Sequence, residues 1–222
     1  MSELTTEPAR SASRLPAPPE PGRSDRKRQS IMEAATLLFL RKGYQGTSMD
    51  EIAAVAGVSK QTVYKQFTDK EQLFRDIVFS ITNRADEIVR TVGAIVDATT
   101  DTETGLRELA RRYASSVTRP QVLQLRRLVI GEADRFPDLA RAYFEQAPER
   151  GIAAVAAGLS RLSERNLLRV GDPVLAASQF AYLVLGLLLD RAMFYGNDSV
   201  TSEDIERAAE EGVRVFLAAY GW

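Results

Sequence analysis

Apolar positions repeat at helical spacing along almost the whole chain. Over residues 26–41 they recur three or four positions apart, and Gly43 follows as a C-terminal stop. Two short helices are predicted next. The first begins after Ser48, which forms a capping-box pattern with Glu51, buries Ile52, Ala53 and Val55, and ends at Gly57. The second begins after Ser59. No segment shows the alternation typical of a strand. The pattern therefore predicts an all-α protein.

Beyond residue 68 the same spacing predicts six further helices. One apolar stripe continues to about residue 97 and predicts a single helix of roughly 45 Å, at about 1.5 Å per residue. Later stripes cover residues 106–117, 120–133, 136–162, 173–196 and 201–220, with a kink or break near Pro148. In total we expect about nine helices: an N-terminal three-helix domain that contains a helix-turn-helix, then a six-helix bundle.

The first 22 residues differ from the rest of the chain. They hold five of the nine prolines and almost no large apolar side chains, so we expect a disordered tail. They also lack the apolar core of a signal peptide, and a cytoplasmic protein is expected. The predicted boundaries divide the chain into this tail (1–22), an N-terminal domain (23–70) and a C-terminal domain (71–222).

Charge is distributed unevenly between these segments. The net charge of −1 would alone argue against binding nucleic acid. However, residues 23–75 contain ten Lys or Arg against six Asp or Glu, whereas residues 76–222 contain 17 against 21. All five lysines lie in the first of these two segments. A basic patch attached to an acidic body is the charge pattern of a DNA-binding protein.

The second short helix has the side chains of a DNA-reading helix. Val58 and Val63 are expected to point inward, which leaves polar side chains for a major groove. Glutamine can pair with an adenine edge, and Lys, Tyr and Thr can reach phosphates. Thr68 and Glu71 form the pattern of a capping box, and Lys70 beside them is expected to anchor a phosphate. The candidate DNA-contacting residues are Thr47, Ser48, Ser59, Lys60, Gln61, Thr62, Tyr64, Lys65 and Lys70.

Four short motifs carry a resemblance to a known family. They are T-S-x-x-x-I-A, A-G-V-S, T-V-Y-x-x-F and K-E-x-L, all within residues 47–73. Over residues 24–75 the chain resembles the TetR (tetracycline-repressor) family, except that Gln61 stands where many members have a glycine or another small residue. Residues 125–151 resemble the C-terminal domain of its AefR-like branch. The resemblance implies a DNA-binding regulator, usually a repressor, that pairs through its last two helices. It implies that residues 23–70 are the DNA-binding domain and that residues 71–222, the six-helix bundle, are the ligand-sensing and dimerisation domain.

An apolar segment near the C-terminus predicts a subunit interface. Residues 180–189 are apolar on every side, and at ten residues they are too short to span a bilayer. Together with small residues on the last helix they predict a four-helix bundle between two chains, although the core of one domain is the simpler alternative. The resemblance favours the dimer. The candidate interface residues are Leu183, Leu187, Ala208, Ala209, Gly212, Val213 and Phe216.

A sensing cavity is expected among the fourth to seventh helices, and a two-fold dimer would suit a palindromic operator. The inducer is expected to be a small hydrophobic or amphipathic molecule. An architectural or constitutive DNA-binding protein without an inducer is the alternative. The candidate lining residues, each of which could equally be plain core, are Phe79, Tyr113, Arg126, Leu128, Phe144 and Tyr182.

An enzyme is not expected. The chain has no His and no Cys, which excludes His-based triads, thiol nucleophiles and the usual zinc ligand sets. It has no glycine-rich phosphate loop. Glu132 and Asp134 have no other ligand type beside them, so we expect no metal site, and no cofactor is expected.

Overall fold

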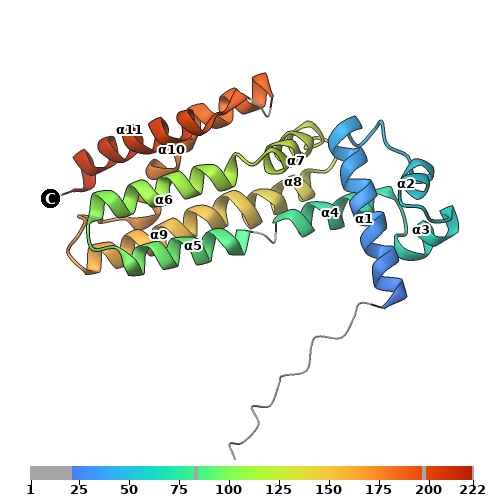
Figure 1. Ribbon diagram of the computed structural model, residues 1–222, viewed down its shortest axis with the longest axis horizontal. Coiled ribbons are helices and arrows are strands. Elements are labelled where there is room, and N and C mark those ends of the chain that lie inside the picture. The colour runs from blue at the N-terminus through green and yellow to red at the C-terminus, as the bar shows by residue number, and fades with distance from the viewer. Residues whose placement is uncertain (1–21, 83–84, 197–198, 222) are drawn as a thin grey trace, which may run out of the picture.

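The computed structural model describes residues 22–82, 85–196 and 199–221, so the predicted tail lies outside the described residues except for Gly22. The described residues form eleven α-helices, one π-helical turn and no strand, which confirms the all-α prediction (Figure 1). The helices are α1 (Arg23–Lys42), α2 (Met49–Val55), α3 (Lys60–Gln66), α4 (Lys70–Thr82), α5 (Ala85–Ala98), α6 (Thr102–Val117), α7 (Pro120–Gly131), α8 (Pro137–Phe144), the π-turn η1 (Glu145–Glu149), α9 (Arg150–Glu164), α10 (Pro173–Tyr195) and α11 (Ser202–Tyr220).

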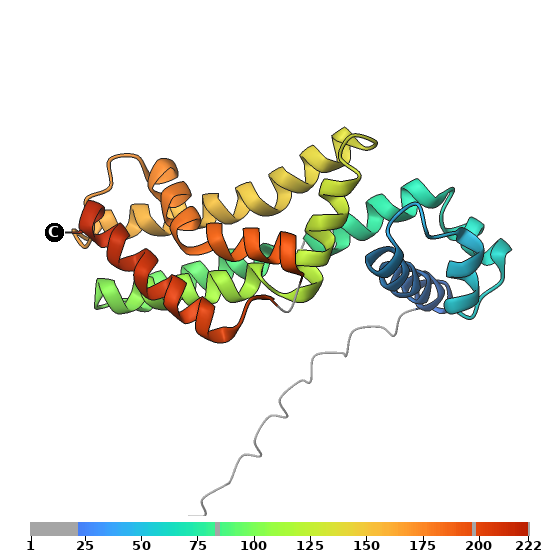
Figure 2. The ribbon, with the colours of Figure 1, turned by 90° about the horizontal axis from the view of Figure 1, so that it is seen from above.

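The molecule is elongated. Helices α1–α3 lie at one end, and the C-terminus lies at the opposite end, in both views (Figures 1 and 2). Helix α4 leads from the α1–α3 end toward the body, where α5, α6, α9, α10 and α11 run side by side. Helices α7 and α8 lie between the two ends and contact α1 and α4.

The predicted helix-turn-helix forms as its end signals indicate. The Ser48 and Ser59 side chains each accept a hydrogen bond from the backbone three residues on, and so cap α2 and α3. Gly57 has φ +64°, a conformation that favours glycine, at the turn between them. Ile52 and Ala53 are buried as expected, but Val55 is exposed because it lies off the buried face of this short helix.

The prediction of a single long helix after residue 68 is wrong. Its apolar stripe is divided between α4 and α5, and residues 83 and 84 between them lie outside the description. The two halves of the stripe pack into different cores. Leu73, Phe74, Ile77 and Val78 of α4 join the N-terminal core, whereas Val92 and Val96 of α5 join the core of the body. The helical spacing predicted burial correctly, but it carried no information about which core each half enters.

The N-terminal core extends into the body of the protein. Besides side chains of α1–α4 it contains Leu125, Val129, Phe136, Leu139 and Tyr143 from the α7–α8 region. Its centre is aromatic. The ring centroid of Tyr44 lies 5.1 Å from that of Phe74 and 4.9 Å from that of Phe136, distances at which aromatic pairs attract. The DNA-reading end is therefore packed directly against α7 and α8.

The break predicted near Pro148 is confirmed in an unusual form. Pro148 lies inside the π-turn η1, which joins α8 to α9. Proline has no backbone N–H to donate in a helix, so a locally widened turn accommodates it. Pro148 and Ala147 of this turn also line the main cavity.

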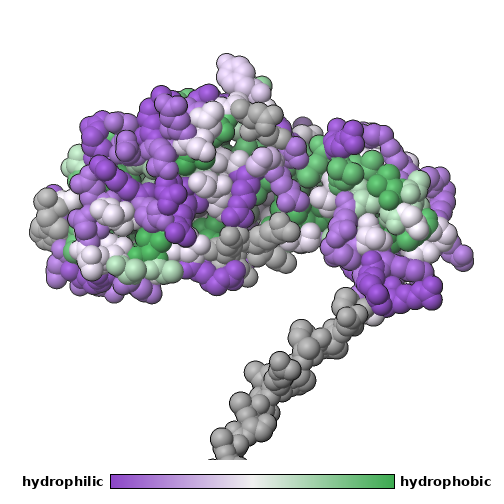
Figure 3. Space-filling model, viewed as in Figure 1, coloured by the Kyte–Doolittle hydropathy of each residue, from purple (hydrophilic) through white to green (hydrophobic). Residues whose placement is uncertain are grey.

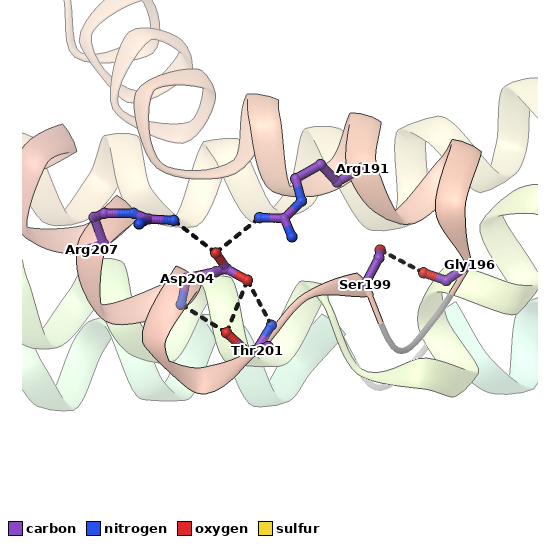
Figure 4. Close-up of polar contacts among 6 residues, drawn as sticks. All are labelled: Arg191, Gly196, Ser199, Thr201, Asp204 and Arg207. Carbon is purple, nitrogen blue, oxygen red and sulfur yellow. Dashed lines mark hydrogen bonds and ion pairs between the residues drawn. The ribbon is translucent and has the colours of Figure 1, made fainter.

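Helices α10 and α11 are held together by a polar clasp around Asp204 (Figure 4). Its carboxylate accepts hydrogen bonds from the backbone N–H and hydroxyl of Thr201, at 3.1 and 2.9 Å. It also pairs with Arg191 of α10 at 2.9 Å and with Arg207 at 2.8 Å. The Thr201 bonds, and then that from Arg191, hold the pKa of Asp204 at about 2. These contacts join the start of α11 to α10.

Helix α10 agrees in extent with the predicted helix 173–196 and contains the apolar segment 180–189. It has 23 residues, and among the described residues it is the one helix that is long and apolar enough to cross a membrane by length and composition alone. In the structure α10 packs against α6, α7, α9 and α11 as part of the bundle.

Candidate DNA-binding surface and ligand cavity

The exposed face of α3 presents the side chains expected of a DNA-reading helix. Lys60, Gln61, Tyr64 and Lys65 are exposed, whereas Val63 is fully buried against the N-terminal core. Thr62 is partly exposed and its hydroxyl lies 2.8 Å from that of Ser59. One rigid helix thus holds two ammonium groups, an amide and a phenol toward solvent.

Two lysines near α3 are paired within the chain. The Lys60 ammonium lies 2.7 Å from the Asp50 carboxylate of α2, and Lys42 pairs with Glu51. The hydrogen bond to the Asp50 side chain, and then the attraction of its negative charge, raise the pKa of Lys60. The pairing of Glu51 with Lys42 also leaves the predicted capping box of α2 half formed, since only Ser48 caps. Such exposed pairs are weak, so a phosphate can replace the carboxylates.

Thr47 and Lys70 are placed differently from the prediction. Thr47 is buried, and its hydroxyl donates to the Gly43 carbonyl. The Lys70 ammonium donates to the carbonyls of Tyr44 and Thr47, each at 2.9 Å, and lies 4.3 Å from the Tyr44 ring centroid. Burial lowers the pKa of Lys70, and the Arg135 guanidinium lowers it further. Both side chains secure the turn between α1 and α2 in this structure.

The start of α4 is capped by residues that the sequence reading missed. The backbone N–H of Gln72 donates to the Asp69 carboxylate, and the Gln72 side chain accepts from the backbone N–H of Thr68, both at 2.8 Å. The predicted pair of Thr68 with Glu71 does not form, because Glu71 pairs with Arg75 instead. Asp69 followed three residues later by Gln72 is itself a cap-like pattern, so the signal was present.

Arg28 fastens α1 to the following helices. Its guanidinium pairs with Asp76 of α4 at 2.5 Å, donates to the Gln66 carbonyl and lies 4.3 Å from the Phe67 ring centroid. Every one of these contacts is internal to the chain. Arg28 therefore positions α3 from behind.

Hydrophobic side chains gather at the N-terminal end of the molecule on the face seen in Figure 3, whereas hydrophilic ones cover most of the body there. The exposed side chains of Leu37 in α1 and Val55 in α2 belong to this end. The α3 side chains described above supply polar groups to the same end.

An apolar cavity of about 180 Å³ lies in the body of the protein. Its wall is built from the C-terminal end of α4 and from α5 to α10, so more helices contribute than the fourth to seventh that were expected. The predicted residues Tyr113, Arg126, Phe144 and Tyr182 line it. Phe79 and Leu128 do not, because both pack against the N-terminal core.

Three polar groups stand out in this cavity. Tyr113 and Tyr143 are buried, and each phenol lies close enough to the Arg126 guanidinium to interact with its charge. Burial raises the pKa of Tyr113 to about 12, although Arg126 opposes the shift. Burial raises the pKa of Tyr143 in the same way. Both phenols are therefore neutral hydrogen-bond donors at physiological pH.

The candidate interface residues divide into two groups. Leu183 and Leu187 of α10 are exposed, Leu187 by 74%. In contrast, Ala209, Gly212, Val213 and Phe216 of α11 are buried inside the chain, and Ala208 is partly buried against the same core. Within the chain, the α11 stripe faces Phe180 and Val184 of its own α10. Further exposed apolar side chains on α10 are Val174, Leu175, Tyr182, Phe194 and Tyr195.

Known proteins resemble both parts of the chain. Residues 31–77 match the model of the tetR family of bacterial regulatory proteins, and residues 104–222 match the C-terminal domain of AefR-like transcriptional repressors. A TetR-family regulator from Mesorhizobium loti is 44% identical, with a TM-score of 0.84, over 91% of this chain and 100% of that one. The Flavonoid-responsive Regulator FrrA is 34% identical, with a TM-score of 0.67, over 88% and 97%.

Three curated relatives match over shorter segments. The transcriptional activator FasR of Mycolicibacterium smegmatis is 33% identical over 89 residues, which are 40% of this chain and 39% of FasR. The chain spans about a quarter of two further curated regulators. These relatives are helix-turn-helix transcriptional regulators, and none is an enzyme. With both of its parts matched, this chain belongs to the TetR family of DNA-binding transcriptional regulators and carries an AefR-like C-terminal domain.

Proposed function

We propose that this regulator is a cytoplasmic repressor that binds a palindromic operator as a homodimer and is released by a small hydrophobic or amphipathic molecule. The observation that carries the proposal is the position of the cavity. Ile81 and Thr82, at the C-terminal end of α4, form part of its wall, and the other end of α4 packs under the DNA-reading end. A ligand that moves α4 would reposition α3.

Release requires that the ligand favour one of two conformations. A molecule that binds both equally shifts nothing, however tightly it binds. Because α4 and Tyr143 belong both to the cavity wall and to the N-terminal core, a ligand that repacks them changes the free energy of the DNA-binding conformation. This contiguity supports sensing rather than constitutive binding.

The exposed apolar face of α10 supports a homodimer. Leu187, Phe194 and Tyr195 are each at least 74% exposed. Large apolar side chains gathered on one helix are typical of a protein interface. A second α10 packed against this face would cover them, and the two-fold axis would present two α3 helices to successive major grooves. We place Leu183 and Leu187 in this interface and leave out the buried residues of α11.

The proposed DNA contacts centre on α3 and its N-terminal cap. Gln61 is assigned to a base edge, and Lys60, Tyr64 and Lys65 to phosphates, because their side chains are exposed. The hydroxyls of Ser48, Ser59 and Thr62 are assigned to phosphates at the helix starts. Thr47 and Lys70 are assigned a supporting role, through the carbonyl and ring contacts that hold the α1–α2 turn.

The relatives help to decide whether the protein represses or activates transcription, and which kind of ligand it binds. The C-terminal match is to AefR-like repressors, which supports repression, whereas FasR is described as an activator. FrrA is described as flavonoid-responsive, and an apolar cavity with phenol and guanidinium groups is compatible with an aromatic ligand here as well.

Binding to the promoter DNA beside the gene tests the proposal. Fluorescence anisotropy would measure affinity against a random duplex over a range of salt concentrations, and sedimentation would give the number of chains per site. We expect specific binding by two chains or a multiple. Lys65→Ala should weaken binding to all DNA and reduce the salt dependence, whereas Arg107→Gln on the exposed face of α6 should change neither. Binding no stronger than to random DNA would indicate an architectural protein.

A further inference from the structure

We propose that the cavity is selective for an anion: a compact aromatic or apolar molecule that carries one carboxylate or similar acidic oxygen group, with Arg126 as the residue that selects it. The inference rests on the proposed sensing function and goes further by naming the charge of the ligand. The argument depends on which charges line the cavity, which of them are paired, and how much space remains.

The charged residues described for the cavity wall are all positive. Among the described lining residues are two arginines, Arg119 and Arg126, and neither an Asp nor a Glu. Residues 76–222, which supply this whole wall, contain 17 Lys or Arg against 21 Asp or Glu, so the positive charge is local to the cavity. An apolar site with a low dielectric strengthens the attraction between such a cation and an incoming anion.

Arg126 has no counter-ion in the part of the chain that the structure describes. In contrast, the arginines of the neighbouring helix α6 are paired with Glu108 or Glu103, and Arg127, beside Arg126 on α7, donates to the Ala192 carbonyl. Arg126 is only partly exposed, makes no hydrogen bond or ion pair with a described residue, and lines a cavity whose wall is mostly apolar. Holding a guanidinium there without a partner is costly. A bound anion would offset that cost.

The phenols of Tyr113 and Tyr143 complete a donor set around Arg126. Their hydroxyls make no hydrogen bond within the described residues, yet neither oxygen is fully buried, so both are accessible from the cavity. A carboxylate accepts several hydrogen bonds and donates none. Two neutral phenols and a guanidinium therefore match a carboxylate better than an amide or an amine, and bonds to charged acceptors are the stronger ones.

The space beside these donors fits a compact ligand. The remaining wall is apolar, with Ile81, Leu185 and Leu189 among its side chains. A Cβ on Gly151 would lie 3.1 Å from the Tyr113 hydroxyl oxygen, so this glycine keeps room next to the phenol. A volume of about 180 Å³ slightly exceeds the roughly 150 Å³ cavity that holds benzene in an engineered protein, so one substituted ring fits.

Three probes that differ only in charge test the inference: trans-cinnamate, cinnamamide and cinnamylamine. Calorimetric titration would measure their dissociation constants on the full-length protein. We expect cinnamate to bind about tenfold or more tighter than the amide, and the amine to bind most weakly. Arg126→Gln should remove the preference for cinnamate while leaving amide binding intact. Arg107→Gln, an arginine on the exposed face of α6, is the matched control and should bind like the wild type.

Several results would overturn the inference. These are amide binding as tight as that of cinnamate, an equal loss of both in Arg126→Gln, or no binding of any probe. Thermal unfolding checks that Arg126→Gln folds, and Tyr113→Phe, which should weaken cinnamate more than the amide, tests the donor set separately. Operator binding measured alongside separates the two proposals. Release by the amide as efficient as by cinnamate would keep the sensor and reject the anion, whereas absence of specific operator binding would reject the regulator itself.

Discussion

Raising the pH from 8 to 11 should destabilise the folded protein through the buried phenol of Tyr113. Burial raises its pKa to about 12, against 10.0 for a free tyrosine. Below pH 10 the phenol is neutral in both the folded and unfolded states, so its pKa does not affect stability. Between the two values the unfolded chain loses the proton that the folded protein retains, which favours unfolding.

The magnitude follows from the two pKa values. At pH 11 the unfolding equilibrium constant is raised about tenfold, which is about 1.4 kcal/mol. Tyr113→Phe removes this contribution but leaves the other titrating groups in place. The difference in unfolding free energy between the wild type and Tyr113→Phe should therefore change by about 1.4 kcal/mol between pH 8 and pH 11, with the wild type losing more.

Urea unfolding followed by circular dichroism at the two pH values would measure this difference, and tyrosinate absorbance would follow ionisation in the folded protein. Tyr64→Phe, which removes an exposed phenol from α3, outside the proposed dimer face, is the matched control and should follow the wild type. Parallel stability profiles for the wild type and Tyr113→Phe would refute the reasoning, because they would mean that the phenol ionises alike in both states.

Four further substitutions test other parts of the structure. Gln61→Ala should change the preference among operator variants by about 1–3 kcal/mol in anisotropy competition, and an unchanged preference would remove Gln61 from base reading. Leu187→Glu should shift the dimer toward monomer in sedimentation and weaken operator binding. Gly158→Ala should destabilise by about 1 kcal/mol in urea unfolding despite its higher helix propensity, because the added Cβ would lie 2.9 Å from a Val92 methyl carbon. Thr201→Ala should lower stability by about 0.5–2 kcal/mol through loss of the α11 cap, and an unchanged midpoint would contradict that role.

Features encoded within a few residues could be predicted from the sequence. The caps at Ser48, Ser59 and Asp172 and the left-handed turn at Gly57 appear where the local pattern indicated. Helical spacing also identified most of the buried side chains. Both kinds of signal depend on neighbours in the chain, so one sequence contains them.

Features that depend on distant contacts could not be predicted in this way. Whether Lys70 reaches a phosphate or two backbone carbonyls depends on where the α1–α2 turn lies. The stripe of α11 packs in one core with side chains of its own α10, and this depends on how the chain returns between the two helices. Phe79 and Leu128 face the N-terminal core rather than the cavity because α4 and α7 bridge the two. Helical spacing of apolar residues indicates that a side chain is buried, but it does not identify the element against which that side chain packs.

The shared N-terminal core has a consequence for engineering. A boundary at residue 70, drawn from the family motifs, would cut through this core, because Phe74 of α4 and Phe136 before α8 pack on Tyr44. A segment of residues 23–70 transplanted onto another regulator would expose these contacts and would need new apolar neighbours. Chimaeras that exchange DNA specificity should therefore keep α1–α4 together and match the surface that α7 and α8 present. The transplanted DNA-binding helices would then remain coupled to the ligand cavity of the recipient protein.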